Sequence, residues 1–296
     1  MEQRQHKANA MNVLSVQSHV AYGYVGNRAA AFPLQRLGFD VWAVNTVQFS
    51  NHTGYGSWTG EVFTAEHVRD VIEGIFQRSA PETCDAILSG YLGDADLGEA
   101  ILEAVARVRA ARDDALYVCD PVMGDHGRGV FVRPAIPEFM RERAVPTADV
   151  VIPNQFELEL LTGAEIRSVK DAIEAARALL SLGPKAAIIT SLQHDETPED
   201  MIQMLGVSNG GAWLVSTPFL PLEPPPNGAG DAVSALFLAH YLRSGRSVPA
   251  ALSAMASAIF EVISATHQAG TRELQFIEAQ DRLVRPSRAF EVLSLA

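Results

Sequence analysis

Short runs rich in β-branched residues alternate along this chain with longer stretches in which apolar residues recur every three or four positions. The short runs are typical of buried strands, and the longer stretches are typical of amphipathic helices. Strands are predicted at residues 12–16, 40–47, 86–89, 116–119, 150–152 and 186–189. Helices are predicted at residues 27–38, 65–78, 96–112, 169–182, 229–244, 249–267 and 274–283, with shorter ones after Pro134 and from Asn154. Because strands that alternate with helices form βαβ units, we expect an α/β fold with a mainly parallel sheet.

Two apolar segments depart from this alternation. Residues 201–207 and 212–216 are joined by a short Asn- and Gly-rich segment, which predicts a hairpin and an antiparallel edge of the sheet. The Pro-rich run 221–226 has strand and helix material on both sides, so we interpret it as a stiff loop within a domain. We therefore expect one domain over residues 11–296, preceded by a disordered tail at residues 1–10.

The composition excludes several classes of function. The formal net charge of −12 argues against a general nucleic-acid or anionic-membrane surface, which requires a basic face. The N-terminus has no apolar signal segment, and no stretch reaches 18 uninterrupted apolar residues, so no transmembrane helix is expected. The only two cysteines, Cys84 and Cys119, lie in or beside apolar runs and form no CxxC pair. We interpret them as buried free thiols, which suits a cytoplasmic protein.

The strongest local motif is Asn227-Gly228-Ala229-Gly230-Asp231, which precedes an apolar helix. Two glycines at a helix start let backbone N–H groups approach an anion closely, at the positive end of the helix dipole. Such a cup suits the charge that develops on a phosphoryl group during transfer. Asp231 would lie in the first helical turn, where the dipole favours its ionised form and where it can accept a proton from an alcohol. An ordinary helix start with a capping acid is the alternative interpretation.

Further acidic residues follow two of the predicted strands. Asp120 comes directly after the strand at 116–119, and Glu157 follows the strand at 150–152. Because ligands of open α/β sheets bind at the carboxyl ends of strands, we expect both acids near Asp231. Three acids beside a nucleotide require cations, which predicts Mg²⁺ held partly through water. The alternative is that Asp120 is a turn acid and Glu157 a helix-start acid.

Polar and aromatic side chains follow the first two predicted strands. Residues 15–27 and 45–55 mix hydroxyls, amides and aromatic rings, and Asn27 is a plausible N-cap for the first helix. A small, flat and polar heterocycle would find hydrogen bonds and stacking surfaces there. Taken alone, each segment is more often an ordinary loop.

Together these segments resemble the pyridoxal kinases of the ribokinase-like superfamily, in the order and spacing of that family and over nearly the whole chain. The matching segments are Val-Gln-Ser-His-Val (16–20), Asn-Thr-Val-Gln-Phe-Ser-Asn-His-Thr (45–53), Leu-Ser-Gly-Tyr-Leu-Gly (88–93), Cys-Asp-Pro-Val-Met-Gly (119–124), Pro-Asn (153–154) and Gly-Ala-Gly-Asp (228–231). The last segment indicates only a ribokinase-like kinase, whereas the first two point to pyridoxal. The resemblance implies a three-layer α/β/α sandwich with an open, mainly parallel sheet.

The resemblance also implies a reaction. The γ-phosphoryl group of ATP would be transferred to the 5′-hydroxymethyl group of pyridoxal, giving pyridoxal 5′-phosphate in vitamin B6 salvage. Asp231 matches the general base of the family, and residues 228–230 match its anion hole. Ser18 matches a residue that binds the pyridine ring, while Thr53 and Gly54 match further substrate contacts.

The nucleotide side follows from the same resemblance. Asp120 and Glu157 match positions near the ATP phosphates and the metal. The positions that match residues lining the nucleotide are Ile152, Thr190, Thr217, Pro218, Phe219 and Leu220. The resemblance further implies a homodimer and a lid, for which the glycine-rich loop 122–130 is the candidate. Whether a monovalent cation is needed besides Mg²⁺ stays open.

Two departures from the family pattern and several alternatives accompany this interpretation. Asn227 replaces a common Thr or β-branched residue, and Thr190 stands where some relatives have Lys, so nucleotide affinity is the property in question. A hydroxymethylpyrimidine kinase is the nearest alternative, followed by a sugar or nucleoside kinase. A non-catalytic ligand carrier would keep the pocket without turnover. An NAD enzyme is disfavoured, because no GxGxxG follows the first strand.

Overall fold

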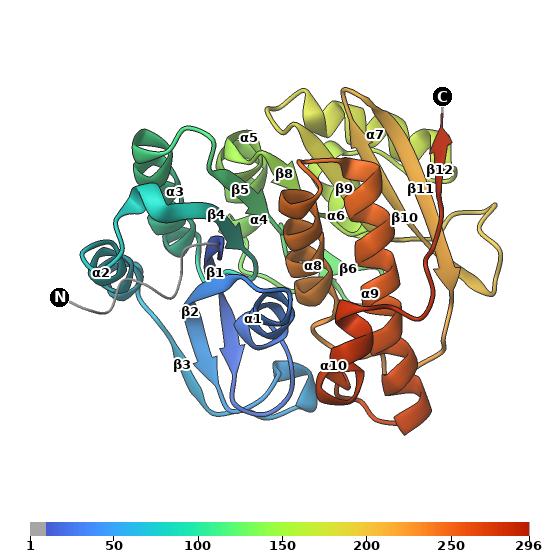
Figure 1. Ribbon diagram of the computed structural model, residues 1–296, viewed down its shortest axis with the longest axis horizontal. Coiled ribbons are helices and arrows are strands. Elements are labelled where there is room, and N and C mark those ends of the chain that lie inside the picture. The colour runs from blue at the N-terminus through green and yellow to red at the C-terminus, as the bar shows by residue number, and fades with distance from the viewer. Residues whose placement is uncertain (1–9, 296) are drawn as a thin grey trace.

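A ten-stranded sheet runs through the whole molecule (Figure 1). The computed structural model describes residues 10–295, so all but one residue of the tail predicted at 1–10 lies outside the described residues. The strand order is β12-β11-β10-β9-β8-β5-β4-β1-β2-β3. These strands are β1 (Asn12–Val20), β2 (Asp40–Phe49), β3 (Gly60–Val62), β4 (Cys84–Ser89), β5 (Leu116–Cys119), β8 (Val150–Val151), β9 (Ala186–Leu192), β10 (Met201–Ser208), β11 (Gly211–Pro218) and β12 (Val292–Leu295).

The centre of the sheet is parallel and its edges are antiparallel. The neighbours from β9 through β8, β5, β4 and β1 to β2 all pair in parallel. β10, β11 and β12 pair antiparallel at one edge, and β3 pairs antiparallel with β2 at the other. The predicted hairpin is present, since Ser208 pairs with Gly211 across a two-residue turn. The predicted fold class, with an antiparallel edge, is therefore confirmed.

Helices cover both faces of the sheet and complete the three layers. One face carries α1 (Asn27–Arg36), α8 (Ala229–Arg243), α9 (Val248–Ala269) and α10 (Phe276–Val284), which lie in front of the sheet in Figure 1. The opposite face carries α2 (Ala65–Phe76), α3 (Ala95–Ala111), α4 (Ala135–Phe139), α5 (Val145–Thr147), α6 (Gln155–Thr162) and α7 (Val169–Leu180). Each layer buries its own apolar cluster against the sheet, which fixes the strand ends relative to α8.

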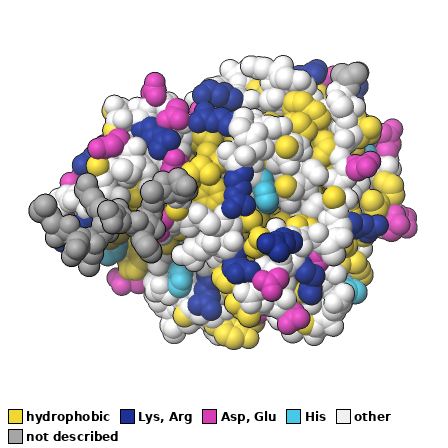
Figure 2. All heavy atoms as spheres, in the orientation of Figure 1, with side chains coloured by type: hydrophobic (Ala, Val, Ile, Leu, Met, Phe, Trp, Pro, Cys, Tyr) yellow, Lys and Arg dark blue, Asp and Glu magenta, His cyan; other side chains and the backbone are white. Residues whose placement is uncertain are grey.

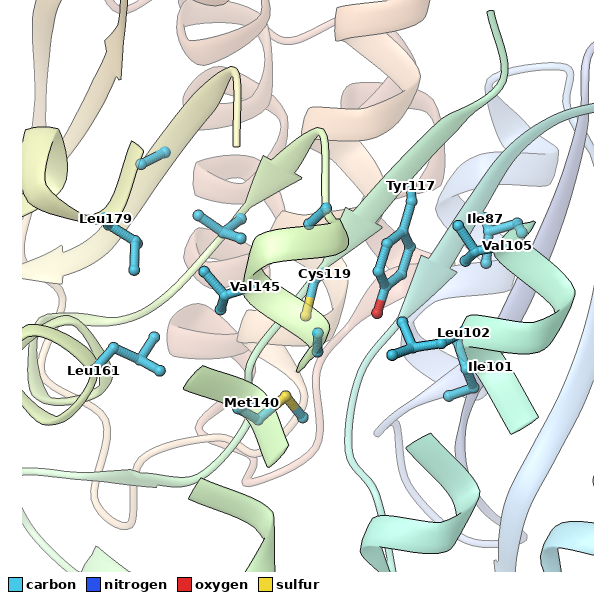
Figure 3. Close-up of a cluster of buried hydrophobic side chains, with 14 of the residues drawn as sticks. Ile87, Ile101, Leu102, Val105, Tyr117, Cys119, Met140, Val145, Leu161 and Leu179 are labelled. Atoms are coloured by element: carbon cyan, nitrogen blue, oxygen red, sulfur yellow. The ribbon is translucent and has the colours of Figure 1, made fainter. Parts of the chain in front are cut away.

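The core on the second face is closely packed. Figure 3 shows Tyr117 of β5 beside Ile101, Leu102 and Val105 of α3, and all four side chains are buried. The Tyr117 hydroxyl is satisfied there, because it lies 2.9 Å from the Ser89 hydroxyl oxygen. A buried strand with satisfied polar atoms gives the segment after residue 119 a rigid support.

Helix α9 is long and apolar enough to cross a membrane by length and composition, with a mean hydropathy of 1.6 in its most apolar window. Of that window, 61% is buried inside the protein, where α9 packs on α8, α10 and the strands β10 and β11. It is therefore a core helix of the front layer.

On the face in Figure 2, basic side chains are scattered among apolar and uncharged ones.

Three details differ from the sequence prediction. The first helix is capped by Gly26, not by Asn27, because the buried Asn27 amide donates to Val44 O and Asn45 Oδ1. The edge strands β3 and β12 were not predicted, since they are short and depend on their neighbours for pairing. The loop at 122–130 forms a small hairpin, β6 (Gly124–Asp125) with β7 (Gly129–Val130).

Candidate active site

The carboxyl ends of the strands bring the predicted site residues to one edge of the sheet. In spatial order from β11 to β2, the residues at this edge are Thr217, Thr190, Ile152, Asp120, Ser18 and Thr53. The first three, predicted to line a nucleotide, lie on one side of Asp120. The last two, predicted to bind a vitamin, lie on its other side. We call the side of Thr217, Thr190 and Ile152 the nucleotide half and the side of Ser18 and Thr53 the vitamin half. The Asp120 carboxylate lies between them.

Helix α8 begins at this edge with the predicted glycine motif. Gly228 is its N-cap, at φ +86°, and a Cβ there would clash with the backbone carbonyl of Tyr24. Only glycine satisfies both requirements. Ala229 is half-buried, whereas Gly230 is exposed, with no atom within 4 Å of the place a Cβ would occupy. The first-turn amides of α8 thus face an open space at the positive end of the helix.

Asp231 is half-buried and held by a second helix. Its Oδ2 accepts a hydrogen bond of 2.8 Å from the N–H of Gly26, the N-cap of α1. Gly26 in turn lies against Ser18, so closely that any Cβ would clash with the Ser18 carbonyl. Asp231 is therefore fixed at the vitamin half of the edge.

The environment of Asp231 changes its acidity in a direction the sequence did not predict. Burial raises the pKa of Asp231 to about 6, and the Gly26 hydrogen bond only partly opposes this. The helix dipole was expected to favour the ionised form, but the loss of water outweighs it. With this pKa the carboxylate is about nine-tenths ionised at pH 7 and is a stronger base than an ordinary aspartate.

Asp120 lies at the centre of the edge and is only 5% exposed. The Ser234 hydroxyl of α8 donates to its Oδ2 at 2.8 Å, and no residue among 10–295 donates to its other oxygen. Burial, followed by the charges of Glu157 and Asp231, raises the pKa of Asp120 well above its usual range. Within the described part of the chain, none of these three acids forms an ion pair. The cluster is suited to a cation that would relieve this repulsion.

Glu157 is built into the start of α6. Its Oε2 accepts the Asn154 N–H at 2.9 Å in a capping box, and its Oε1 accepts the Met123 N–H at 2.9 Å. Glu157 therefore has the helix-start role that was the alternative interpretation of this residue. Burial raises the pKa of Glu157 despite these hydrogen bonds. Because both oxygens serve backbone amides, a water-mediated contact to a cation suits Glu157 better than direct ligation.

No group of three or more His, Cys, Asp or Glu side chains among residues 10–295 is arranged to hold a metal by itself. Asp120 provides one free carboxylate oxygen, and the phosphates of a nucleotide would have to complete the coordination. This pattern fits a cation that arrives with its nucleotide.

The nucleotide half is formed by backbone-paired strand ends. Thr190 N–H donates to Pro153 O at 3.0 Å, which joins the ends of β9 and β8. Thr217 is buried at the end of β11. Phe219 is 42% exposed and lies between the half-buried Pro218 and Leu220. An exposed aromatic ring at a strand end offers a surface on which a base can stack.

The vitamin half contains a bulge and a short helical turn. Ser18 lies where the register between β1 and β2 shifts, and its side chain is buried. Thr53 and Gly54 are exposed in a 3₁₀ turn at Thr53–Tyr55. His52 caps this turn, since its Nδ1 accepts the Gly54 N–H at 3.1 Å. Burial lowers the pKa of His52, which keeps it neutral and able to accept.

Sequence reasoning missed two residues at this site, Arg272 and Glu273, and it missed the contact of Gly26 with Asp231. Gly26 acts through its backbone N–H, which no side-chain pattern reveals. Arg272 and Glu273 contact the vitamin half from a turn more than 200 residues away in the sequence. A charged pair before a helix is an ordinary sequence feature, so no local signal identifies them.

In this fold, backbone N–H groups at the start of a helix lie beside an aspartate that can act as a base. This arrangement is that of a ribokinase-like small-molecule kinase. A sequence profile of the family described as phosphomethylpyrimidine kinase matches residues 39–276, and the chain belongs to this family, within its pyridoxal kinases. The pyridoxal kinase PdxY of Rubrobacter xylanophilus is 56% identical over 98% of this chain and 99% of that relative. The pyridoxal kinase PdxY of Deinococcus radiodurans is 51% identical over 94% of this chain and 95% of its own.

Solved structures agree with these relatives. The structure of the pyridoxal kinase of Leishmania donovani in complex with ADP and pyridoxamine is 33% identical, with a TM-score of 0.88. The similarity covers 97% of this chain and 100% of that one. The pyridoxal kinase interpretation of the sequence is thus confirmed at the level of family, fold and enzyme class.

Proposed function

We propose that this enzyme phosphorylates the 5′-hydroxymethyl group of pyridoxal with ATP, using Asp231 as the general base. The observation that carries this proposal is the position of Asp231. It accepts the N–H of Gly26, which abuts Ser18 at the vitamin half, and its charge also acts on Asp120 toward the nucleotide half. A base between the two halves can reach an alcohol that faces a phosphate.

In this mechanism Asp231 orients the 5′-hydroxyl and takes its proton. The hydroxyl oxygen forms the new bond to the γ-phosphorus, and the bond from phosphorus to the β–γ bridging oxygen breaks, releasing ADP. The amides at Gly228, Ala229 and Gly230 donate to the phosphoryl oxygens as their charge spreads. The hairpin at 124–130 would close over the phosphates and exclude water.

The substrates would occupy the two halves in line. Ser18 would bind the pyridine ring, with Thr53 and Gly54 as further contacts. The nucleotide would lie along Ile152, Thr190, Thr217, Pro218, Phe219 and Leu220, and the exposed ring of Phe219 supports stacking of the base.

A divalent cation, which we propose to be Mg²⁺, would neutralise charge on the ATP phosphates when bound. Asp120 would hold it directly and Glu157 through water, as their free and occupied oxygens indicate. We further propose a cytoplasmic homodimer.

A coupled ATP-consumption assay tests the function. Pyridoxal, pyridoxine, pyridoxamine and hydroxymethylpyrimidine are offered side by side, and the phosphate ester is identified by mass spectrometry. We expect pyridoxal to give the highest kcat/KM. A higher value for hydroxymethylpyrimidine would overturn the substrate assignment, and pyridoxal binding without ATP consumption would support a non-catalytic carrier instead.

A further inference from the structure

The turn between α9 and α10 is anchored in the core of the molecule. Leu274 and Phe276 are fully buried, and the Gln275 N–H donates to Thr266 Oγ1 at 3.0 Å. The Gln275 side chain donates to Glu273 O at 2.9 Å, so the backbone of the turn is fixed from both sides. The two charged residues of this turn, Arg272 and Glu273, therefore extend from a rigid support.

Glu273 joins the two loops of the vitamin half. Its Oε2 accepts the Tyr24 N–H at 3.1 Å, in the loop that leads to Gly26, and its Oε1 accepts the hydroxyl of Tyr55, in the turn that contains Thr53. A Cβ at Gly23 would clash with the Glu273 carboxylate, so glycine permits this approach. One carboxylate thus sets the spacing between the loop of Gly26 and the turn of Thr53.

Arg272 supports the same turn from its other side. Its Nη2 donates to Gly54 O at 3.0 Å, and its guanidinium lies 4.0 Å from the centre of the Tyr55 ring. Stacking and hydrogen bonding together fix the plane of Tyr55. Burial and the contact with Glu273 raise the pKa of Tyr55 to about 12, so its hydroxyl remains a donor over the whole working range.

We infer that Arg272 and Glu273 are positioning residues that hold the vitamin-side loops at a fixed distance and so determine the affinity for the vitamin. This inference rests on the proposed function of those loops. Among residues 10–295, neither side chain hydrogen-bonds to a residue of the nucleotide half or to the first-turn amides of α8. Loss of the pair should therefore weaken binding of the vitamin more than binding of ATP, because small displacements of binding groups have large effects.

The test compares Glu273→Gln and Tyr55→Phe with Glu278→Gln, an exposed charge on the first turn of α10 that serves as the matched control. We expect Glu273→Gln to raise the KM for pyridoxal about tenfold, which is the usual contribution of a charge-assisted hydrogen bond. The KM for ATP should stay within about twofold. Tyr55→Phe should raise the KM for pyridoxal less. The double variant should resemble Glu273→Gln, because both changes break the same contact.

Two further measurements keep the outcomes distinct. Melting temperatures show whether each variant is folded, and fluorescence titration with pyridoxal in the absence of ATP measures affinity without turnover. Absence of pyridoxal phosphorylation by the wild type would refute the proposed function, whereas the titration would still test the loops. An unchanged pyridoxal affinity in folded Glu273→Gln, or an equal rise in both KM values, would overturn the positioning role.

Discussion

Asp149 and Asp120 lie at opposite ends of neighbouring strands, and their carboxylates are almost equally buried, yet their acidities move in opposite directions. Asp149 precedes β8 and is 7% exposed, while Asp120 follows β5 and is 5% exposed. Burial would raise the pKa of Asp149, but hydrogen bonds from Lys185, the Tyr117 N–H and Arg109 together lower it. At Asp120, neighbouring carboxylates add to the effect of burial.

The difference separates the amino ends of the strands, where a buried charge stabilises the fold, from the carboxyl ends, where the acids form a reactive site. At the amino end each oxygen of Asp149 has a donor, so ionisation stabilises the folded state. At the carboxyl end, acids without a basic partner destabilise the folded protein but leave their charge available to a cation and an alcohol. Changing one acid at each end should therefore separate activity from stability.

The largest effect is expected from Asp231→Asn. We expect kcat to fall by about 10²–10⁴, because the general base is lost while the Gly26 N–H retains an acceptor. The KM for ATP should stay within about twofold. Steady-state kinetics with pyridoxal and ATP measure both.

The same variant should be more stable than the wild type at pH 8. A raised pKa means that the charged form of Asp231 destabilises the folded state above about pH 6, and that this penalty disappears as the pH falls toward the ordinary value. Melting curves at pH 8 and pH 4.5 measure the gain, which should be present at the first pH and shrink at the second. A full kcat would remove Asp231 as the base.

Asp149→Asn should have the opposite signature. We expect it to lower the free energy of unfolding by about 1–3 kcal/mol, because Lys185 and Arg109 lose the negative charge of their partner. The loss is limited because both basic side chains are partly exposed and can still be solvated by water. kcat should stay within about twofold. Because the folded pKa is depressed below the ordinary value, the stability difference should be fully present above about pH 4 and be lost as the pH falls through the lower folded pKa. Urea unfolding at pH 7 and at a series of pH values below about 4, beside an activity assay, checks the prediction.

The carboxyl-end half of this contrast could be predicted from the sequence, whereas the role of Asp149 was not predicted. The alternation of strands and helices places Asp120 and Ser18 at one sheet edge, because parallel strands share their carboxyl ends. The glycine motif correctly predicted the start of α8, and the Asn154–Glu157 spacing corresponds to the capping box now observed.

The rest depends on contacts between distant segments. The raised pKa of Asp231 requires knowledge of what surrounds it, and its Gly26 partner is a backbone amide brought from 205 residues away. Glu273 meets Tyr24 only because Leu274 and Phe276 are buried in the front layer. Local patterns carry no information on such packing.

The pH dependence of kcat/KM sharpens the comparison at the carboxyl end. Protonation of Asp231 removes the acceptor for the substrate proton, so kcat/KM for pyridoxal should fall below about pH 6 and be about tenfold lower at pH 5 than on its plateau. The residual activity of Asp231→Asn provides the control and should not change around pH 6. A wild-type profile that is flat from pH 5 to pH 7 would contradict the assignment.

The smallest effect is expected from Lys185→Ala. The Lys185 Nζ lies 2.7 Å from Asp149 Oδ1, but its side chain is 72% exposed, so water and salt screen the pair. We expect a loss of less than about 1 kcal/mol in the free energy of unfolding, decreasing further at high salt. If urea unfolding instead gave a loss as large as that of Asp149→Asn, the exposed ion pair with Lys185 would account for the whole stabilising effect of Asp149. A smaller loss would mean that Asp149 acts mainly by fixing the Tyr117 N–H and Arg109, which places its effect in the core beneath β5.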